Sequence, residues 1–390
     1  MLYFEVSEYQ ERLRKTKEAM QQRGIEVLLV TDPANMNYLT GYDGWSFYVH
    51  QGVIVALNRQ EPIWFGRQQD SNGARITTWL QDHNVRGYTD DYVQSQVKHP
   101  MSFAVDLLKE IGCDRKDLGV EMDNYYFTGR CLDQLRHDLP NDTIKNGDLI
   151  VNWVRSIKSA QEIDYLRMAS RIAEKVMQTA VDSIDVGVRE GDAAANVYHA
   201  QISGTAEFTG DYSAIIPIMP SALRTSTAHL SWVDRKYETG DVVLLELSGC
   251  KNRYHAPLSR TVYLGKPPAE LDEIAKVVIH GLNRTLDFIK PGVTAEQVEE
   301  TWRHAIAGSR VVKESRVGYA YGLNYPPDWG EHTISLRPGD RTVLRPGMTI
   351  HFMPGIWLDR FGFECSEPFL VTENGCETFV DFPRQLFVKE

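Results

Sequence analysis

The sequence predicts an α+β protein of two domains, an N-terminal α/β domain over residues 1–155 and a strand-rich C-terminal domain over residues 156–390. Three observations lead to this prediction. The chain has 390 residues, which is more than a single hydrophobic core usually spans. In the first part, helical and strand patterns alternate, as in an α/β domain. In the second part, a long amphipathic helix and apolar strands favour a sheet covered by helices.

The first part begins with a helical pattern over residues 8–23 that stops at Gly24. Short apolar runs bounded by turn formers follow, and they predict strands. A second helix is predicted over residues 103–112. The predicted strands are "IEVLLVTD" (25–32), "QGVIVAL" (51–57), "PIWFG" (62–66) and "LGVEMD" (118–123).

The domain boundary is expected near residue 155, just before the stretch "SAQEIDYLRMASRIAEKVMQTAVDSI". Ser159 and Glu162 in that stretch fit a capping box, which marks the start of a long helix. The other predicted elements are helices over 270–292 and 294–308, the latter with a capping box of Thr294 and Gln297, and strands over 241–250, 254–265, 348–359 and 361–372.

The composition excludes several classes of protein. The chain is 42% hydrophobic and 24% charged, with a net charge of −11 and no basic cluster of the kind that binds nucleic acid. It contains no apolar run of about 18 residues, so no membrane span is predicted. The N-terminus carries early acidic residues and lacks the apolar core of a signal peptide. We therefore expect a cytoplasmic protein.

The cysteines indicate reduced thiols. They are five in number, scattered, and form no CxxC motif, which is typical of a cytosolic protein. The alternative is a nucleophilic Cys365 close to the candidate site. The five positions are Cys113, Cys131, Cys250, Cys365 and Cys376.

Glu246 lies within the apolar run "VVLLELSG". A carboxylate at the centre of a strand must face water or be paired, because burying it alone costs free energy. It either points outward on the polar face of the strand or faces a polar cavity that binds a cation. Glu364 and Glu367 in "FGFECSEPFLV" pose the same question. They are three apart and should point to opposite faces of a regular strand, so at most one of them faces a common site.

The histidines and tyrosines of the second part are ambiguous without further information. A lone histidine is more often structural than catalytic, and buried tyrosines more often pack than react. His229 in "STAHLSW" lies in a polar turn, and His255 follows a tyrosine in a strand. The remaining candidates are His332 in "GEHTIS" and Tyr319 and Tyr321 in "GYAYG".

Four stretches of the second part resemble the pita-bread family, whose members include creatinase, prolidase, aminopeptidase P and methionine aminopeptidase. "VRSIKSAQEIDYLRMAS" resembles the start of the family's first helix. "TAHLSWVDRKYETGDVVLLELSG" resembles the active-site histidine and first metal strand, and "RYHAPLSRT" resembles the second metal strand. "LRPGMTIHFMPGIW" resembles the strand that normally ends in Glu-Pro-Gly. The resemblance implies a pita-bread catalytic domain over 156–390 and a creatinase/prolidase-like domain over 1–155.

The resemblance also implies that the metal ligands of the family are replaced. Metal-dependent members hold two ions with two aspartates, a histidine and two glutamates. The matching positions hold Glu246, Pro257, Tyr319, Met353 and Ser366, or Glu367 if the register slips by one. Two divalent ions need several carboxylate and imidazole ligands. We therefore expect no metal and no other cofactor.

Creatinase is the metal-free precedent in this family. It cleaves a C–N bond of a guanidinium substrate with the histidine that matches His229 and with carboxylates that hold the cation. The carboxylate of its Arg-Thr strand matches Ser259 here, which argues against creatine. The stretch "ELSGCKNRYHAPLSRT" is most similar to the ectoine hydrolases, which open the cyclic amidine of ectoine. The resemblance implies hydrolysis of ectoine to N-acetyl-diaminobutyrate, with hydroxyectoine as a second candidate substrate.

A mechanism follows from these residues. The amidinium of ectoine is protonated at neutral pH, so its ring carbon is electrophilic without a metal. A carboxylate of Glu246, Glu364 or Glu367 would pair with the amidinium. His229 would take a proton from the attacking water and return it to the departing nitrogen. Direct attack by a glutamate, through an acyl-enzyme, is the alternative route.

Substrate contacts are expected from the same resemblance. A homodimer is expected, because in creatinase the small domain of the partner subunit helps close the site. The other enzymatic hypotheses are a creatinase-type hydrolase of another amidino or guanidino compound and a metal-dependent proline peptidase. The non-enzymatic hypothesis is a pita-bread binding protein. The candidate contacts are His255, Tyr319 and Tyr321, Trp45 and Phe47 across the dimer interface, and Arg224, Arg316 or Arg341 for the substrate carboxylate.

Overall fold

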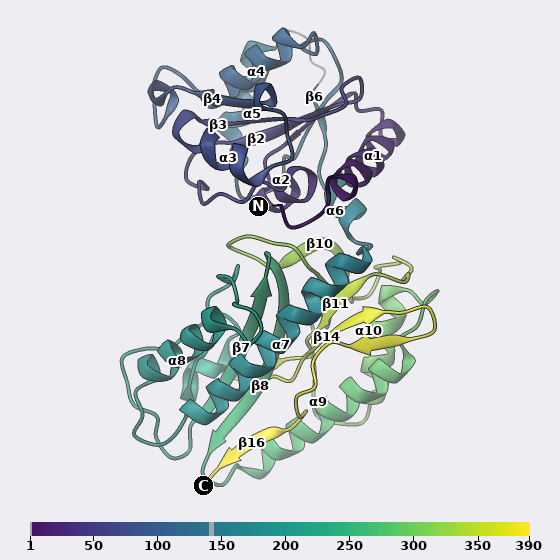
Figure 1. The fold of residues 1–390 in the computed structure, drawn as a ribbon. Coiled ribbons are helices and arrows are strands. Elements are labelled where there is room, and N and C mark those ends of the chain that lie inside the picture. Colours follow the sequence, from purple (N-terminus) through teal and green to yellow (C-terminus); the bar gives the residue numbers. More distant parts are fainter. Residues whose placement is uncertain (1, 140–143) are drawn as a thin grey trace. The chain divides into compact units, whose positions relative to one another are not determined.

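The computed structural model describes residues 2–139 and 144–390, which divide into two compact units, Met1–Arg155 and Ser156–Glu390 (Figure 1). Each unit has its own hydrophobic core. The first unit combines helices with a mostly parallel sheet, and the second packs helices on antiparallel strands. The predicted fold class is therefore confirmed.

The N-terminal unit is built on a six-stranded sheet in the order β4-β3-β2-β1-β5-β6. Antiparallel pairs join β1 to β2 and β2 to β3, while the outer pairs are parallel. The strands are β1 (Val27–Val30), β2 (Gly52–Ala56), β3 (Ile63–Arg67), β4 (Val85–Tyr88), β5 (Leu118–Val120) and β6 (Ile144–Asn146). The helices are α1 (Val6–Gln22), α2 (Pro33–Thr40), α3 (Ser71–Thr77), α4 (Pro100–Glu110), α5 (Gly129–Asp138) and α6 (Ile150–Arg155), with short 3₁₀ turns at Gln68–Asp70, Asp82–Asn84 and Asp90–Tyr92.

Helices α4 and α5 pack on one face of this sheet, where their apolar side chains join those of β1 and β2 in one core (Figure 1). Each helix begins at a capping side chain. His99 accepts a hydrogen bond from the Met101 N–H at the start of α4, and Thr128 accepts one from the Cys131 N–H at the start of α5. Arg86 of β4 also pairs with Glu110 at the end of α4. The caps fix where both helices begin over the sheet.

The C-terminal unit contains a five-stranded sheet in the order β10-β9-β11-β14-β15, a three-stranded sheet in the order β16-β8-β7, and the small pair β12-β13. The long helices are α7 (Ala160–Ser183), α8 (Glu190–Ser203), α9 (Ala269–Phe288) and α10 (Ala295–Ala305), with a 3₁₀ turn at Ala222–Ser226. The strands are β7 (Val242–Lys251), β8 (Tyr254–Leu264), β9 (Gly318–Tyr321), β10 (Gly330–Ser335), β11 (Thr349–Phe352), β12 (Ile356–Trp357), β13 (Gly362–Phe363), β14 (Glu367–Val371), β15 (Cys376–Thr378) and β16 (Leu386–Lys389).

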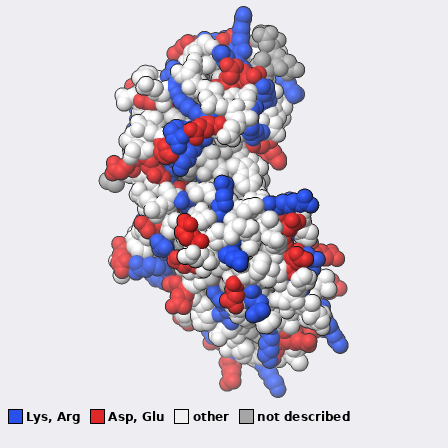
Figure 2. All heavy atoms as spheres, turned by 90° about the vertical axis from the view of Figure 1, so that its right-hand side faces the viewer, with Lys and Arg blue, Asp and Glu red and all other residues white. Residues whose placement is uncertain are grey.

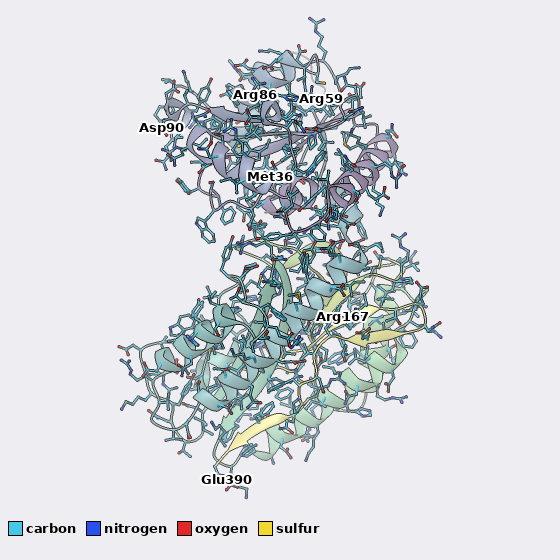
Figure 3. All side chains as sticks on the ribbon, viewed as in Figure 1. Met36, Arg59, Arg86, Asp90, Arg167 and Glu390 are labelled. Atoms are coloured by element: carbon cyan, nitrogen blue, oxygen red, sulfur yellow. The ribbon has the colours of Figure 1, made fainter. Side chains whose placement is uncertain are left out.

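Helices α7 and α8 cover one face of β7 and β8, and α9 and α10 pack in a second core with β9, β11 and β14 (Figure 1). Both predicted capping boxes are confirmed, at Ser159 with Glu162 and at Thr294 with Gln297. Figure 3 labels Arg167 on the exposed side of α7, where it pairs with Glu377 at 3.4 Å. On the opposite face of β7 and β8, Val242, Leu244 and Tyr263 join the second core, and Glu246 lies farther along the same face of β7.

Two of the predicted strands are interrupted. The run over 348–359 divides into β11 and β12 at Met353 to Gly355, and the run over 361–372 divides into β13 and β14 at Glu364 to Ser366. In the first case a proline lacks the N–H that a strand ladder needs. In the second, the backbone of Glu364 is bonded to the Thr261 hydroxyl instead of to a neighbouring strand.

The surface agrees with the composition. On the face drawn in Figure 2, acidic and basic side chains are interspersed, without the continuous basic patch that nucleic acid requires. Within residues 2–139 and 144–390, no helix is both long and apolar enough to cross a membrane.

Arg260 is fully buried on β8 and ties this strand to β14 and to the segment before β16. Its guanidinium donates to the backbone carbonyls of Ser259, Ser366, Phe382 and Pro383 at 2.7–2.9 Å and to Glu367 Oε1 at 2.7 Å. The arginine and the glutamate are both 0% exposed. This pair therefore has a structural role.

Replacing Arg260 with methionine should lower the free energy of unfolding by about 3–5 kcal/mol, because it leaves Glu367 and several carbonyls buried without this partner. Chemical denaturation measures the change. Arg341→Met is the matched control, since that side chain is 86% exposed. An Arg260→Met protein as stable as the wild type would contradict the structural role.

Candidate active site

Glu246 lies on β7 directly opposite Ser259 of β8. Its neighbours Leu245 and Leu247 point to the other face of the strand, into the core under α7 and α8. Glu246 itself is 5% exposed. The sequence left two orientations for Glu246, toward solvent or toward the interior, and in the structure the side chain points to the interior.

Glu364 approaches the same place from the break between β13 and β14. The Thr261 hydroxyl holds its backbone, accepting from the Glu364 N–H at 2.8 Å and donating to its carbonyl at 2.9 Å. The side chain is 1% exposed, and its Oε1 has no hydrogen-bond partner among the described residues. Two carboxyl groups from distant parts of the chain thus share one buried region.

Burial raises the pKa of Glu246 to about 7, and the nearby charge of Asp328 adds to the effect. Burial also raises the pKa of Glu364 well above its ordinary value, and the charge of Glu246 adds to it. Lys313 and the Ser259 hydroxyl act in the opposite direction on Glu364. Because neighbouring carboxylates resist ionising together, the pair holds one proton near neutral pH. It can therefore offer an acid and a base side by side.

Lys313 is a buried cation whose charge acts on Glu364. Its Nζ donates to the Gly355 carbonyl at 2.7 Å and to Ser315 Oγ at 2.9 Å, and lies 4.7 Å from the centre of the Trp357 ring. Burial lowers the pKa of Lys313 to about 8, and the charge of Glu364 opposes this. Sequence reasoning missed Lys313, because it lies in a charged loop between α10 and β9 that shows no periodic pattern.

A buried chain of hydrogen bonds connects the two larger sheets beside this region. The Trp329 Nε1–H donates to Tyr319 Oη at 2.8 Å, and Tyr319 Oη lies 3.1 Å from His351 Nδ1. His351 Nε2 lies 2.8 Å from Ser366 Oγ, which also accepts from the Ser259 N–H at 2.7 Å. Burial lowers the pKa of His351 to about 3, so the ring is neutral. Sequence reasoning missed Trp329 and His351, and Tyr319 is part of this chain.

Arg316 lies against the same tyrosine. Its guanidinium is 4.4 Å from the centre of the Tyr319 ring, and its Nη1 donates to Ser335 at 3.1 Å. Of the three arginines considered for a substrate carboxylate, Arg224 donates to the Ser231 carbonyl, and Arg341 is exposed near Glu296. Arg316 is thus the one in contact with a residue of the buried region.

The predicted histidines lie in different surroundings. His229 is exposed in the loop after the 3₁₀ turn, and neither a hydrogen bond nor an ion pair joins it to the described residues. His255 is fully buried on β8, where its Nε2 accepts from the Ala214 N–H at 2.9 Å. Burial lowers its pKa to about 4. His332 is half-exposed and lies 2.8 Å from Asp328.

Other predicted residues have surroundings of their own within each unit. Glu367 is bound by Arg260 and Arg384 at the start of β14. Tyr321 is buried, and burial raises its pKa well above the ordinary value, with the charge of Glu331 adding to the effect. In the N-terminal unit, Trp45 is 62% exposed, and its ring lies 4.7 Å from that of Phe47.

The residues at the family's metal positions do not form a metal site in this chain. Pro257 and Met353 offer no oxygen or nitrogen side-chain ligand, and Glu367 is bound by two arginines. Within residues 156–390, all of which the structure describes, no three histidine, cysteine, aspartate or glutamate side chains come close enough to hold an ion. The donor set therefore does not fit the dinuclear metal centre of the metallopeptidases.

Comparisons with known proteins bear on both units. The model of the metallopeptidase family M24 matches residues 164–373, and that of the creatinase/prolidase N-terminal domain matches residues 12–157. An ectoine hydrolase of Halomonas elongata is 43% identical, covering 100% of this chain and 99% of its own. An uncharacterized hydrolase/peptidase of Sinorhizobium fredii is 44% identical over both full lengths.

Solved structures give the same fold at lower identity. A dipeptidase of Mycobacterium ulcerans superposes with a TM-score of 0.82 at 22% identity, covering 99% of each chain. The prolidase of Pyrococcus horikoshii superposes with a TM-score of 0.80 at 23% identity, covering 96% of this chain and 99% of its own. Together with the family matches, these similarities confirm the predicted two-domain pita-bread fold.

Proposed function

The chain belongs to metallopeptidase family M24 and is a hydrolase, and from this premise we propose that it opens the ring of ectoine without using a metal. The observation that carries the proposal is the buried pair of Glu246 and Glu364, in a region whose metal-ligand positions are replaced. The likeness to an ectoine hydrolase over the full length supports the choice of substrate.

In the proposed reaction, ionised Glu246 pairs with the amidinium N–H groups of ectoine through a charge-assisted hydrogen bond. Such a pair is favourable here because the substrate cation offsets the cost of ionising a buried carboxyl group. Glu364 keeps its proton at neutral pH because of burial and the nearby charge of Glu246. Arg316 is proposed to bind the substrate carboxylate, since it is the arginine that contacts Tyr319.

Water then adds to the electrophilic ring carbon, and His229 accepts the proton that the water loses. The tetrahedral species collapses as a ring C–N bond breaks, and His229 returns the proton to the departing nitrogen. One molecule of water is consumed, and N-acetyl-diaminobutyrate is the product. In the alternative route a glutamate attacks the carbon, and water hydrolyses the acyl-enzyme. The role of His229 rests on its place in the family motif.

Further parts of the proposal rest on likeness alone. We expect a cytoplasmic homodimer in which the N-terminal unit of a second copy brings Trp45 and Phe47 to the substrate. His255, Tyr321 and the Tyr319 hydroxyl are proposed as substrate contacts in the C-terminal unit. Their burial supports a shielded site, in which charge-assisted contacts are strong.

A panel of substrates tests the function. The purified protein is incubated separately with ectoine, hydroxyectoine, creatine and an Xaa-Pro dipeptide, and products are identified by mass spectrometry. A product heavier than ectoine by one water is expected. Turnover of creatine alone would favour the creatinase-type hydrolase, and turnover of the dipeptide alone would favour the proline peptidase. Binding without turnover of any compound would indicate a non-catalytic protein.

The pH dependence of the reaction should follow Glu246. Its pKa is raised to about 7, so the group is protonated below that pH and ionised above it. Pairing with the amidinium needs the ionised form, so kcat/KM should rise about tenfold per pH unit below pH 7 and level off above it. Initial rates in ectoine measure the profile. A profile that is flat between about pH 5 and pH 7 would exclude Glu246 as the pairing group.

A further inference from the structure

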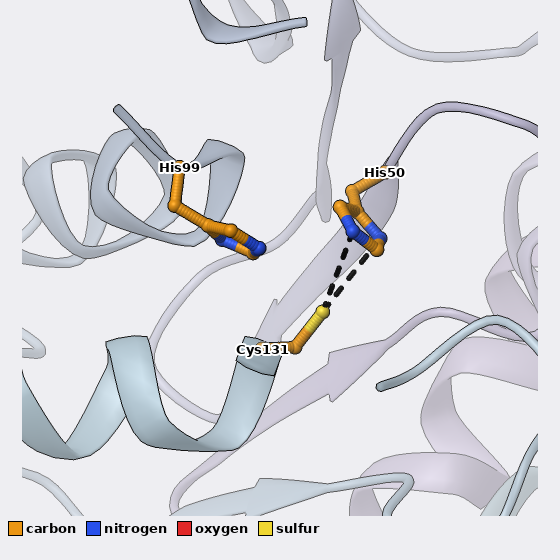
Figure 4. A group of neighbouring side chains, drawn as sticks. All are labelled: His50, His99 and Cys131. Atoms are coloured by element: carbon orange, nitrogen blue, oxygen red, sulfur yellow. Dashed lines mark hydrogen bonds between the residues drawn. The ribbon is translucent and has the colours of Figure 1, made fainter. Parts of the chain in front are cut away.

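Three side chains that the active-site account does not use meet in the N-terminal unit (Figure 4). His50 lies just before β2, His99 caps α4, and Cys131 lies in the first turn of α5. Their possible ligand atoms all lie within 4.8 Å of one another. The Cys131 Sγ is 3.6 Å from His50 Nδ1, and the two imidazole rings are 5.0 Å apart.

We propose that His50, His99 and Cys131 bind a zinc ion, with a fourth coordination position open to the cavity beside them. One thiolate and two imidazoles are the ligands that zinc prefers. Mg²⁺ and Ca²⁺ prefer oxygen ligands, so this set discriminates against them. Sulfur and nitrogen ligands at about 2.3 and 2.0 Å from a tetrahedral ion lie about 3.5 Å from each other.

The geometry needs little change to reach that arrangement. The sulfur and the His50 nitrogen already have the required separation, at 3.6 Å. The remaining ligand atom, on His99, lies within 4.8 Å of both, so it must move by about 1 Å. A rotation of one imidazole ring supplies such a movement without a change of the backbone.

The protonation states of the histidines suit a metal. Burial lowers the pKa of His50, and burial and the charge of His50 lower that of His99 to about 4. Both rings are therefore neutral at pH 7 and offer a lone pair. The backbone of Tyr126 forms a hydrogen bond that raises the pKa of His50, as a carbonyl does when it accepts a ring N–H. Metal-binding histidines usually have such a partner, which fixes the tautomer.

Zinc binding would change the tautomer of His99 and the protonation of Cys131. The His99 Nδ1 accepts from the Met101 N–H at 3.2 Å, so binding through Nε2 moves the ring proton to Nδ1 and replaces this cap. Loss of one cap costs far less free energy than zinc coordination supplies. The Cys131 thiol loses its proton to solvent as the zinc–sulfur bond forms. Burial raises the pKa of the Cys131 thiol, while the hydrogen bonds of Thr128 and the charge of Arg130 act in the opposite direction. A bound zinc ion would itself lower the pKa of the thiol and so favour the thiolate.

The fourth position faces a cavity of about 120 Å³ that His50 and His99 border. A single water needs about 10–15 Å³, so a bound water or a small anion has room. Tyr48, Lys98 and Arg130 line the same cavity. Zinc with one thiolate keeps a positive charge, and the arginine adds another. The fourth ligand is therefore expected to be an anion such as hydroxide.

Cobalt substitution tests the site in the full-length protein. The protein is freed of metal with a chelator, dialysed, and titrated with Co²⁺. A tetrahedral site with one thiolate should take up one equivalent of Co²⁺, with intense visible bands and a sulfur-to-cobalt charge-transfer band in the near ultraviolet. Added Zn²⁺ should displace the cobalt and remove both sets of bands.

Variants assign the bands to these residues. Cys131→Ser should abolish the charge-transfer band, and His50→Gln should weaken Co²⁺ binding at least tenfold while the fold, followed by circular dichroism, is kept. Cys113→Ser is the matched control, because Cys113 is buried in the same unit outside the cluster. Absence of saturable binding, or a charge-transfer band that persists in Cys131→Ser, would overturn the proposal. Ectoine turnover in chelator is a separate measurement, so the two proposals can fail independently.

Discussion

Replacing Glu246 with glutamine should lower kcat/KM for ectoine by about 10²–10⁴-fold, because the amide cannot ionise to pair with the amidinium. Glutamine has nearly the same shape, so packing around β7 should be kept. The same change should raise the free energy of unfolding above pH 7 by up to about 3 kcal/mol, because ionising a buried carboxyl group with a raised pKa costs free energy.

The sign of this stability effect follows from the protonation of the group. The pKa of Glu246 is about 7 in the folded protein and 4.5 in its ordinary state, so the folded protein binds more protons between those values. Its contribution to stability is complete below pH 4.5 and is lost as the pH rises to about 7. Denaturation at several pH values should show this slope in the wild type and a smaller slope in Glu246→Gln.

The exposed Glu373 gives the matched control for both readouts. Glu373→Gln should leave kcat/KM and the pH slope of stability unchanged. A Glu246→Gln enzyme with wild-type activity would contradict the proposed pairing. An inactive variant that is also unfolded would be recognised by denaturation and would point to a structural role instead.

Replacing His229 with alanine should lower kcat by about 10²–10⁴-fold, the usual effect of losing a general acid–base group. Because His229 is exposed and makes no hydrogen bond to the described residues, its removal should leave the free energy of unfolding unchanged. Added imidazole should restore part of the activity, since a small base can replace a missing proton acceptor. Steady-state rates with and without imidazole measure both effects.

His280→Ala is the control for this variant, because His280 is exposed on α9. It should be fully active and insensitive to imidazole. If His229→Ala were fully active, the histidine would have no part in proton transfer. The direct attack of a glutamate on the ring carbon would then become the favoured route.

Local sequence patterns were sufficient for part of this architecture. The capping boxes at Ser159 and Thr294 depend only on residues three apart, and both are confirmed. Glu364 and Glu367 do have different partners, but the period of two is not the reason, because the predicted strand is interrupted at Glu364. In contrast, helix α2 was not predicted. The dipeptide Asp32-Pro33 is typical of a turn, but in the structure Asp32 caps the helix and Pro33 is its first residue.

The missing parts of the site depend on contacts between distant segments. His351 is opposite Tyr319 only because β11 pairs with β9, and this pairing has no local signature. Lys313 reaches Glu364 from an irregular loop. His50, His99 and Cys131 come from three separated elements, so their spacing in the sequence fits no metal-binding motif. Such groups are found only when the tertiary structure brings them together.

We propose that this member of family M24 hydrolyses a cyclic amidine with carboxyl groups instead of metal ions. The most direct test measures ectoine turnover by protein that has been freed of metal and is assayed in excess chelator. We expect a rate equal to that of untreated protein, with a product heavier by one water and no stimulation by added Zn²⁺, Mn²⁺ or Co²⁺. Absence of ectoine turnover, or turnover that appears only when a metal is restored, would contradict it.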